Sequence, residues 1–392
     1  MKVLVYTSLF PNHLEPDKGI FIKQRMFHFA KLDGCEIKVV APVPYIPPWG
    51  WLGKRSLYSR IRPYEIMEGI EVYHPRYPLI PKVGMAAHGF LMFLASRRLL
   101  RRIYAHFPFE LIDAHYIYPD GFAAALLAAS MQKPLVLSAR GSDINQFAAF
   151  KSIRPMIKFA LMHADCAVSV CESLKTEMVS LGIDGNRITV VPNGVDTERF
   201  YPVEKAMARQ KLSIPQGVRV IVSVGALIPR KAFHLVLNSL PDLLGSIPDL
   251  HFFIIGEGPE RSSLEQQIRR MNLRGNVTLL GNRPNEALRD WYNAADVFCL
   301  ASSREGWPNV LMEALACGTP VVATKVYGAP EIITTPAVGV LVDQTSVSIG
   351  KGLRAALETI WDRDHIAAHA GSRDWSKVAH EVKHVFASVM EV

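Results

Sequence analysis

The sequence predicts an α/β protein made of two doubly wound domains, and three observations lead to this prediction. The chain has 392 residues, too many for one ordinary domain of ~100–150 residues. Short apolar runs rich in Val and Ile alternate with helical patterns, which is typical of parallel sheets covered on both faces. This alternation is interrupted near residues 192–202 by Pro-Asn-Gly and Arg-Phe-Tyr-Pro, and then it restarts.

The expected strands are short apolar runs, each followed by a helical pattern. In the first half they cover residues 3–7, 37–41, 111–114, 135–138, 167–170 and 188–191. In the second half they cover residues 220–224, 252–255, 277–280, 297–300 and 321–323, with helices over 234–245 and 260–272. Their Val and Ile content favours strands that are buried on both faces.

The domain boundary is expected near the interruption, which gives a first domain over residues 1–195 and a second over 196–372. A last helical pattern, within residues 373–392, carries an apolar stripe, and we expect it to pack back on the first domain. Ligands of open α/β sheets bind outside the carboxyl ends of the strands. Two such sheets facing across a cleft would therefore carry their functional residues on strand-end loops.

Composition excludes several classes of protein. With 49% hydrophobic and 20% charged residues, the chain can build sizeable cores, unlike a disordered or coiled-coil protein. No apolar run reaches the ~18 residues needed to cross a bilayer, and the N-terminal stretch does not resemble a signal peptide, so a cytoplasmic location is expected. The five cysteines are scattered without a CxxC pair, and neither a metal nor a cofactor is expected.

The excess positive charge lies in the first 110 residues, which hold 16 Lys and Arg against 8 Asp and Glu. Residues 86–106 predict a basic amphipathic helix whose apolar side chains share one side. These apolar residues are Phe90, Phe93, Leu94, Leu99, Leu100 and Ile103, and the flanking cations are Arg97, Arg98, Arg101 and Arg102. Such a helix can bind an anionic membrane surface. The alternative is a core helix with a solvated edge, and nucleic acid is not expected because no nucleic-acid motif accompanies the charge.

Two carboxylates, Glu305 and Glu313, form the most informative pattern. Glu305 follows the expected strand 297–300, and Glu313 lies about one turn into a helix that begins near Pro308 and ends at Gly318. Both carboxylates could therefore face one ligand. The alternative is that Glu313 only complements the helix dipole while Glu305 is solvated.

Backbone amides lie between these carboxylates. The N–H groups of Gly306, Asn309 and Val310, at the positive end of the expected helix, form an anion or hydroxyl site. Carboxylates accept hydrogen bonds from sugar and ribose hydroxyls, and amides suit phosphoryl oxygens. A polyol attached to a phosphate fits this combination of groups.

A second pattern follows the expected strand 220–224, where Arg230 and Lys231 precede the next helix. A departing diphosphate develops negative charge, and two adjacent cations can stabilise it without a metal. The alternative is an exposed Arg-Lys loop with no ligand.

The segment that begins with Glu305-x7-Glu313 continues as Ala-Leu-Ala-Cys-Gly-Thr-Pro-Val-Val-Ala over residues 314–323, and it resembles the signature of the retaining GT-B glycosyltransferases of family 4. Further motifs occur in the order shown by that family: Val-Pro-Asn-Gly-Val-Asp (191–196), Val-Gly (224–225), Ile-Gly-Glu-Gly-Pro (255–259) and Gly281. The resemblance spans nearly the whole chain. It implies two Rossmann-like domains that face across a cleft, with the acceptor on the first and the nucleotide sugar on the second.

The resemblance also implies roles for residues of the second domain. Glu313 would bind the nucleotide ribose, and Glu305 with the amides after it would hold the donor sugar. Lys231 matches the family's phosphate-binding lysine. Many members carry an arginine where this chain has Ala226, and we infer that Arg230 supplies the guanidinium instead.

In the first domain, Gly19 follows the first expected strand, where the family has a glycine that lets backbone amides approach the diphosphate. His115 comes directly after the strand 111–114 and should project into the cleft, beside the donor sugar by resemblance. Asp143, in Arg-Gly-Ser-Asp at 140–143, matches a family loop near the acceptor, and its alternative role is to cap a helix.

The family resemblance implies a transferase that moves a hexose from a nucleotide-sugar donor, with a UDP-sugar as first choice, to an acceptor hydroxyl. Transfer would retain the anomeric configuration and need no metal. The family resemblance and the basic segment 86–106 together lead us to expect a lipid-linked saccharide as acceptor, in polysaccharide or envelope biosynthesis. They also lead us to expect a peripheral position on the inner face of the cell membrane. The alternatives are a GT-B sugar-nucleotide 2-epimerase and a non-catalytic sugar-nucleotide-binding protein.

Overall fold

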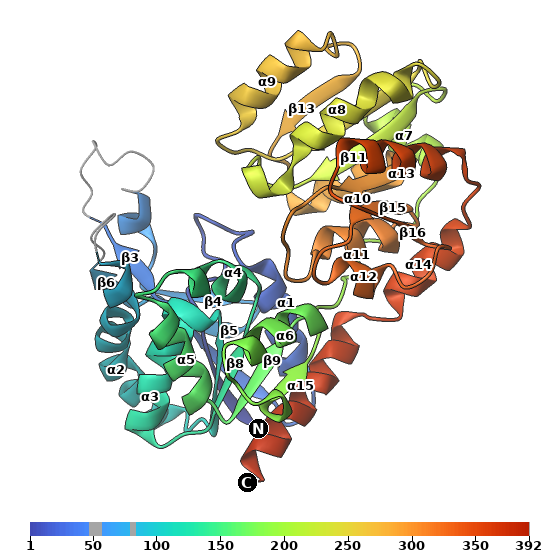
Figure 1. The fold of residues 1–392 in the computed structure, drawn as a ribbon. Helices are drawn as coiled ribbons and strands as arrows, with labels where there is room; N and C mark the ends of the chain where they lie inside the picture. Colours follow the sequence, from blue (N-terminus) through green and yellow to red (C-terminus); the bar gives the residue numbers. More distant parts are fainter. Residues whose placement is uncertain (47–56, 79–83, 392) are drawn as a thin grey trace. The chain divides into compact units, whose positions relative to one another are not determined.

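The computed structural model describes residues 1–46, 57–78 and 84–391 (Figure 1). The chain divides into two compact units, each with its own main sheet. Unit 1 contains Met1–Asn193 and Trp375–Val392, and unit 2 contains Gly194–Asp374. The boundaries expected after residues 195 and 372 lie beside these divisions, and the expected α/β class is confirmed.

Unit 1 has an eight-stranded sheet in the order β10-β9-β8-β7-β1-β2-β5-β4, in which β4 pairs antiparallel with β5 and the other neighbours pair parallel. Its strands are β1 (Lys2–Tyr6), β2 (Glu36–Val40), β4 (Tyr64–Met67), β5 (Ile70–Tyr73), β7 (Leu111–His115), β8 (Leu135–Ser138), β9 (Cys166–Ser169) and β10 (Ile188–Val190), beside the separate parallel pair of β3 (Val43–Tyr45) and β6 (Arg76–Pro78). Its helices are α1 (Ile20–Ala30), α2 (His88–His106), α3 (Phe122–Met131), α4 (Ser142–Asn145), α5 (Arg154–His163), α6 (Glu172–Ser180) and α15 (Trp375–Met390), with short turns η2 (Met85–Ala87), η3 (Ile117–Gly121), η4 (Phe147–Ala149) and η5 (Gly185–Arg187).

Side chains of β1 alternate between the two faces of this sheet, as the period of a strand requires. Val3 and Val5 belong to the buried core that α1 and α15 cover. The Tyr6 hydroxyl lies 3.1 Å from Ser96 Oγ of α2, on the opposite face. The sheet is therefore covered on both faces, as the Val and Ile content predicted.

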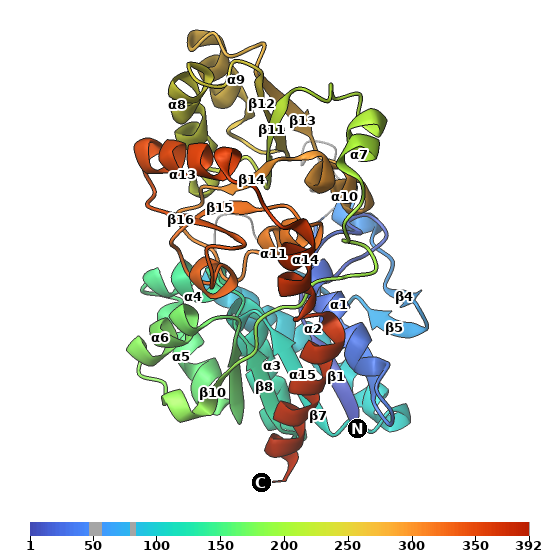
Figure 2. The same cartoon turned by 90° about the vertical axis from the view of Figure 1, so that its right-hand side faces the viewer.

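The C-terminal helix α15 belongs to unit 1 and packs on α1 (Figure 2). Its buried apolar stripe consists of Trp375, Val378, Ala379, Val382, Val385 and Phe386. The Phe386 ring meets Phe29 of α1 edge-on, with 5.2 Å between the ring centroids. The helix thus covers the sheet of unit 1 although its sequence follows unit 2.

Unit 2 has a parallel six-stranded sheet in the order β13-β12-β11-β14-β15-β16. Its strands are β11 (Arg219–Val224), β12 (Leu250–Ile255), β13 (Val277–Gly281), β14 (Val297–Leu300), β15 (Val321–Thr324) and β16 (Gly339–Val342). Its helices are α7 (Lys205–Lys211), α8 (Phe233–Leu244), α9 (Arg261–Arg270), α10 (Asn285–Ala294), α11 (Asn309–Ala316), α12 (Ala329–Ile332), α13 (Ser346–Glu358) and α14 (Arg363–Gly371), with the short turn η6 (Pro229–Lys231).

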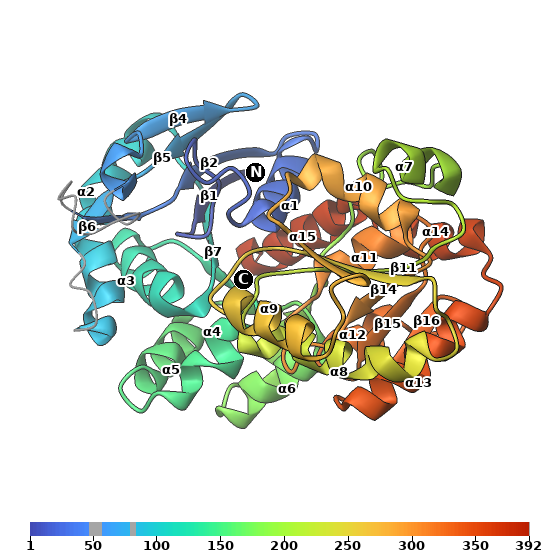
Figure 3. The same ribbon diagram turned by 90° about the horizontal axis from the view of Figure 1, so that it is seen from above.

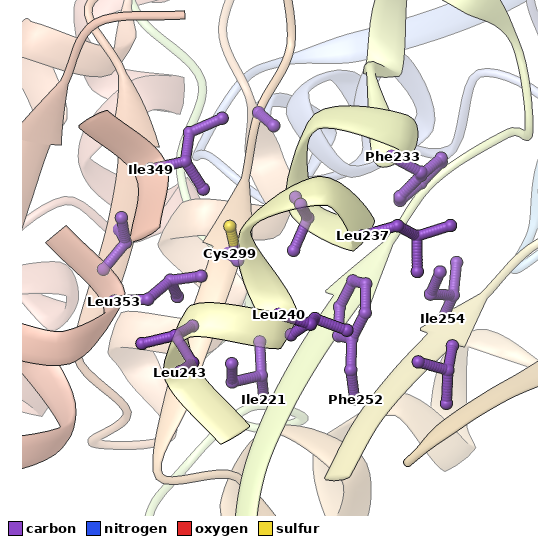
Figure 4. Packing of buried hydrophobic residues seen from close by; sticks show 14 of the residues in the cluster. Ile221, Phe233, Leu237, Leu240, Leu243, Phe252, Ile254, Cys299, Ile349 and Leu353 are labelled. Atoms are coloured by element: carbon purple, nitrogen blue, oxygen red, sulfur yellow. The ribbon is translucent and has the colours of Figure 1, made fainter. Parts of the chain in front are cut away.

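Helices cover both faces of the sheet of unit 2. Figure 3 shows α8, α9 and α13 along one face and α10 and α11 along the other. On the first face, Leu237 and Leu240 of α8 pack among Ile221, Phe252 and Ile349 (Figure 4). Cys299 lies in the same cluster, where its thiol is a small buried hydrophobic group.

The strand order reverses once in each sheet. In unit 1 the chain runs from β1 outward through β2 and then returns to β7 on the other side of β1. In unit 2 it runs from β11 through β12 and β13 and returns to β14 beside β11. At such a reversal point, the loops after the two adjacent strands run to opposite faces of the sheet. They leave a crevice between them where ligands bind. In unit 1 a ligand is therefore expected at the loops after β1 and β7, and in unit 2 at the loops after β11 and β14.

The sequence patterns missed β3 to β6 and β16. The hairpin of β4 and β5 turns through Glu68 and Gly69, whose φ angles are 48° and 84°, as a two-residue hairpin turn requires. Strand β4 is only partly buried, so it lacks the continuous apolar run that marked the other strands. Among the described helices, none is both long and apolar enough to cross a membrane.

Candidate active site

Lys231 and Glu305 meet at the reversal point of unit 2. Lys231 ends the turn η6 that follows β11, and Glu305 lies in the loop that follows β14. Lys231 Nζ lies 2.5 Å from Glu305 Oε1, and their side chains are 12% and 9% exposed. The Ser303 amide also donates to the Arg230 carbonyl oxygen at 2.7 Å, so backbone and side chains both join the two loops.

Glycines allow the loop after β11 to lie against the loop after β12. The Gly225 amide donates to the Ile255 carbonyl oxygen and the Leu227 amide to the Glu257 carbonyl oxygen, both at 2.9 Å. Gly256 has φ 146°, and a Cβ atom there would lie 2.0 Å from the Gly225 carbonyl oxygen. The Gly-Glu-Gly motif therefore fixes the loop that leads to Lys231.

Arg230 precedes Lys231 in the same turn, and its side chain is half-buried. Within the described parts of the chain, its guanidinium has no hydrogen-bond or ion-pair partner. Ala226, the position where many family members carry an arginine, is exposed. Arg230 thus has five N–H donors available for an anion near Lys231.

Glu313 lies in α11, which begins at Asn309 after Pro308 and ends at Ala316, before Gly318 with φ 72°. Its Oε2 atom accepts a 2.7 Å hydrogen bond from the Tyr292 hydroxyl. Burial raises the pKa of Glu313 to about 7. Sequence reasoning missed Tyr292, because an apolar aromatic residue in a helical pattern is usually core.

The amides expected to bind a ligand lie in the same loop. Asn309 and Val310 form the first turn of α11, at the end of the helix where the macrodipole is positive. The Gly306 carbonyl oxygen accepts from the Gly328 amide at 3.1 Å, and a Cβ atom on Gly328 would lie 2.8 Å from that oxygen. The turn after β15 therefore supports this loop, a contact that the sequence patterns did not indicate. Trp307 is buried, and its Nε1 atom has no hydrogen-bond partner among the described residues.

At the reversal point of unit 1, Gly19 caps α1 with φ 63°. A Cβ atom at this position would lie 2.1 Å from the Leu9 carbonyl oxygen, so the turn requires glycine. Across the reversal point, the buried carboxylate of Asp120 accepts hydrogen bonds from the Ser8 amide and, at 3.1 Å, from the Ser8 hydroxyl. Burial raises the pKa of Asp120 to about 7.

His115 ends β7, and its side chain is fully buried, which the expected position at the end of a strand did not indicate. Its Nδ1 atom lies 2.5 Å from Arg140 Nη2, and its Nε2 atom lies 2.9 Å from Asp113 Oδ2. Arginine only donates, so Nδ1 is the accepting nitrogen and the proton lies on Nε2. Burial lowers the pKa of His115 to about 4, and the ring is therefore neutral near pH 7.

Asp143 is also fully buried, and the N-cap residue of α4 is Gly141 rather than Asp143. Its oxygens accept from the amides of Ile117 at 2.8 Å, Arg140 at 3.0 Å and Gly141 at 2.8 Å. Burial raises the pKa of Asp143, and these amides oppose that shift. Asp143 therefore joins the loops after β7 and β8, which corrects its expected role as a helix cap, and its place near the acceptor stays a prediction.

The expected basic helix is α2, but its apolar residues do not share one side. Leu100 and Ile103 are buried with Met92, whereas Phe90 and Leu94 are 49% and 38% exposed. The prediction failed because the helix has two apolar faces. The four arginines at positions 97, 98, 101 and 102 are exposed and have no ion-pair partner among the described residues.

The groups at the reversal point of unit 2 suit a diphosphate and a polyol. Lys231 and Arg230 are cations with unused donors, and Glu305 and Glu313 are acceptors for hydroxyl groups. Among the described residues, no group of three His, Cys, Asp or Glu side chains could hold a metal ion. Lys231 and Arg230 of η6 supply positive charge at this point.

Two models of known protein families match successive parts of the chain. The family model described as Glycosyltransferase Family 4 matches residues 34–199, and the model described as Glycosyl transferases group 1 matches residues 204–370. A Bacillus subtilis protein, TuaC, whose name assigns it to teichuronic acid biosynthesis as a glycosyltransferase, is 33% identical over 85% of this chain and 83% of its own length.

Two further comparisons concern donor and fold. A GDP-mannose-dependent phosphatidylinositol monomannoside mannosyltransferase of Mycolicibacterium smegmatis is 27% identical over 70% of this chain and 71% of its own length. The solved structure of Anabaena HepE in complex with UDP aligns with a TM-score of 0.73 over 99% of this chain and 100% of that one, at 19% identity. Several other curated relatives are matched over about half of their length.

Proposed function

The chain belongs to glycosyltransferase family 4, and from that premise we propose that it is a retaining hexosyltransferase. It would transfer a hexose from a UDP-sugar to a hydroxyl of a lipid-linked saccharide in polysaccharide or envelope biosynthesis. The observation that supports this proposal most is the ion pair of Lys231 and Glu305 at the reversal point of unit 2. Glu305 lies on the loop that leads into α11, the helix of Glu313.

The donor would bind by its diphosphate and its two polyols. Lys231 has three N–H donors and gives one to Glu305, so it can contact a phosphate without losing that partner. Arg230 would bind the diphosphate from the same turn. Glu313 would accept from the ribose hydroxyls, and Glu305 would orient the donor sugar.

Transfer would break the bond between the anomeric carbon and the phosphate oxygen while the acceptor oxygen bonds to that carbon on the same face. The departing phosphate would take the acceptor proton, which keeps the anomeric configuration. Lys231 and Arg230 would stabilise the charge that develops on the diphosphate. His115 would shape the strand end rather than transfer a proton, because its ring is fully buried and its Nδ1 atom accepts from Arg140.

Slow hydrolysis of a panel of nucleotide sugars tests the donor without knowledge of the acceptor. The UDP-bound structure of HepE supports a uridine nucleotide, and the GDP-mannose-dependent relative makes GDP-mannose the comparison of interest. We expect a UDP-hexose to be hydrolysed fastest. Faster hydrolysis of GDP-mannose would contradict the donor assignment. If the protein binds nucleotide sugars but does not turn them over with any acceptor, the result would favour a non-catalytic protein.

The anomer of the sugar released first, followed by NMR, tests retention. An α-linked donor should yield the α anomer before mutarotation. Release of the β anomer would identify an inverting enzyme and contradict the proposed stereochemistry.

The face of α2 that carries Phe90, Leu94 and the four arginines supports a peripheral membrane position. Exposed apolar side chains on one helical face can enter the headgroup region, and each nearby cation contributes ~1 kcal/mol on an anionic surface. A lipid-linked acceptor would then reach unit 1 from the membrane.

Replacing the four arginines at 97, 98, 101 and 102 by Gln should weaken binding to phosphatidylglycerol vesicles by at least about 100-fold, measured by co-sedimentation. A matched control replaces four exposed arginines of unit 2, which are Arg269, Arg270, Arg274 and Arg283. Both variants change the net charge equally. An equal loss of vesicle binding in both would therefore show that overall charge, and not the face of α2, causes the binding. Unchanged binding of the first variant would refute the membrane surface.

A further inference from the structure

Tyr292 of α10 makes a contact with the proposed ribose-binding carboxylate that no sequence motif indicated. The side chain is fully buried, and its hydroxyl donates a 2.7 Å hydrogen bond to Glu313 Oε2. Burial and the nearby carboxylate raise the pKa of Tyr292 well above its ordinary value, so the hydroxyl keeps its proton at every pH at which the protein is handled. It is therefore a permanent donor to Glu313.

The ring of Tyr292 is held in one orientation. Phe200 and Phe298 meet it edge-on, with ring centroids at 5.8 Å and 5.5 Å. The Thr319 hydroxyl donates to the Tyr292 carbonyl oxygen at 2.7 Å, which ties α10 to the turn after α11. A ring packed in this way can direct its hydroxyl to only one place, and that place is Glu313.

The two oxygens of Glu313 have different surroundings. Oε2 accepts from Tyr292, whereas Oε1 has no hydrogen-bond donor among the described residues, and the side chain is only partly buried. A carboxylate with one oxygen fixed by the protein presents the other in a defined direction.

We propose that Tyr292 is a positioning residue for the nucleotide: it holds Glu313 so that Oε1 accepts from the ribose hydroxyls. This inference rests on the proposed function, which supplies the nucleotide. Tyr292 itself does not touch the ligand. Its contribution reaches the nucleotide through Glu313 alone, and it should therefore disappear with a nucleotide that lacks ribose hydroxyls.

The charge of Glu313 depends on several groups that face it. Burial raises its pKa to about 7, the Tyr292 hydrogen bond and Arg199 oppose that increase, and Asp196 adds to it. The Cys317 thiol also lies close and stays neutral, because burial raises its pKa. Removing the Tyr292 hydroxyl removes a hydrogen bond that stabilises the ionised carboxylate of Glu313, so a higher pH is needed to ionise it.

The test compares UDP-glucose with its 2′,3′-dideoxyribose analogue by calorimetric titration of the wild-type protein and Tyr292→Phe. We expect the variant to bind UDP-glucose roughly 10-fold more weakly, the effect of one hydrogen bond to a charged group, and to bind the dideoxy analogue within about twofold of wild type. Tyr201→Phe is a matched control, because the Tyr201 hydroxyl accepts from Arg289 and not from a group that touches Glu313. An equal loss for both ligands would reduce Tyr292 to a structural residue and overturn the inference.

A pH series gives a second readout that a loss of folding would not produce. UDP-glucose carries no phosphate group that titrates between pH 6 and 8, so the change in affinity reports the protein. Wild-type affinity should rise with pH through about 7, and the midpoint should lie higher in Tyr292→Phe. An unchanged midpoint would overturn the inference. If the wild-type protein binds no nucleotide sugar at all, the proposed function fails instead.

Discussion

The two reversal points of strand order, one in each unit, are built from the same elements and joined by different chemistry. In unit 1, the loop after β1 and the loop after β7 are held by Asp120, which accepts from the amide and the hydroxyl of Ser8. In unit 2, the loop after β11 and the loop after β14 are held by the ion pair of Lys231 and Glu305. The first junction is a buried carboxylate with its oxygens occupied, and the second contains a cation with unused donors.

This difference favours unit 2 over unit 1 as the unit proposed to bind an anion. Around the reversal point of unit 1, the carboxylates of Asp120 and Asp143 and the ring of His115 are buried and paired with groups of the same unit. Their hydrogen bonds shape loops. In unit 2, Lys231 and Arg230 retain donors that a diphosphate can take. A position at the end of a strand is therefore not enough for a residue to bind a ligand. The two units differ in whether the side chains at this position have unused hydrogen-bond donors.

The largest effects are expected from removing either side chain of the second junction. Lys231→Ala should lower kcat/KM for transfer by about 100- to 1,000-fold, because one preorganised charge at the leaving group is lost. Steady-state kinetics with the preferred donor measure this change. Glu305→Ala should abolish transfer and leave nucleotide affinity largely intact, since the diphosphate still has Lys231.

Matched controls for these variants lie in the same unit. Lys351 is an exposed lysine of α13, and Glu265 of α9 pairs with Arg261 at 3.0 Å on the surface. Replacing either by Ala should leave the kinetics within about twofold. Comparable losses in the controls would show that the effect of Lys231 or Glu305 is not local.

Removing a buried carboxylate of unit 1 should affect stability instead. Asp143→Ala leaves the amides of Ile117, Arg140 and Gly141 without an acceptor and should lower the free energy of unfolding by about 3 kcal/mol. Chemical denaturation measures this. Nucleotide affinity should stay within about twofold at a temperature where the variant is folded.

Asp184→Ala provides the comparison for Asp143, because Asp184 accepts from the Asn186 amide at 2.9 Å in an exposed turn of the same unit. Its cost should be about 1 kcal/mol. If Asp143→Ala instead kept wild-type stability and lost activity, its carboxylate would act on a substrate, and the contrast between the units would fail.

The smallest expected effect is a pH dependence in which two groups of unit 1 oppose each other. The pKa of His115 is lowered to about 4, so its contribution to stability is complete above about pH 6.5 and is lost as the pH falls toward 4. The pKa of Asp120 is raised to about 7, so its contribution is complete below about pH 4 and is lost as the pH rises through 7. Between pH 5 and 7 the two slopes nearly cancel.

Single variants separate the two slopes. Relative to wild type, His115→Gln should gain about 2 kcal/mol of unfolding free energy when the pH is lowered from 7 to 5, and Asp120→Asn should lose about 2 kcal/mol. Denaturant titrations at the two pH values measure both. Slopes of the same sign would mean that at least one of these groups is not buried as described.

Most of the fold followed from the sequence because buried parallel strands leave continuous Val and Ile runs, as in β11 and β14. The strands β4 and β6 could not be predicted from the sequence, because they are short and partly exposed and are defined by pairing with distant residues. The faces of α2 were assigned wrongly since helical periodicity does not tell which of two apolar stripes a neighbour covers. Packing of Met92 and Leu100 decides that.

For the candidate site, the motif located Lys231, Glu305 and Glu313 correctly on strand-end loops and a helix. The burial of His115 and Asp143 could not be predicted, because the amides and side chains that surround them come from strand β7 and from the loops after β7 and β8. Tyr292 was missed for the same reason: its partner lies on another helix, and its ring looks like an ordinary core residue in the sequence.

A crystal structure of the protein with UDP would show directly whether the side chains of Lys231 and Glu313 bind the nucleotide. We expect a phosphate oxygen at about 2.9 Å from Lys231 Nζ and the ribose hydroxyls on Glu313 Oε1. Nucleotide bound anywhere else, or bound in unit 2 with both of these side chains beyond hydrogen-bonding distance, would contradict this expectation.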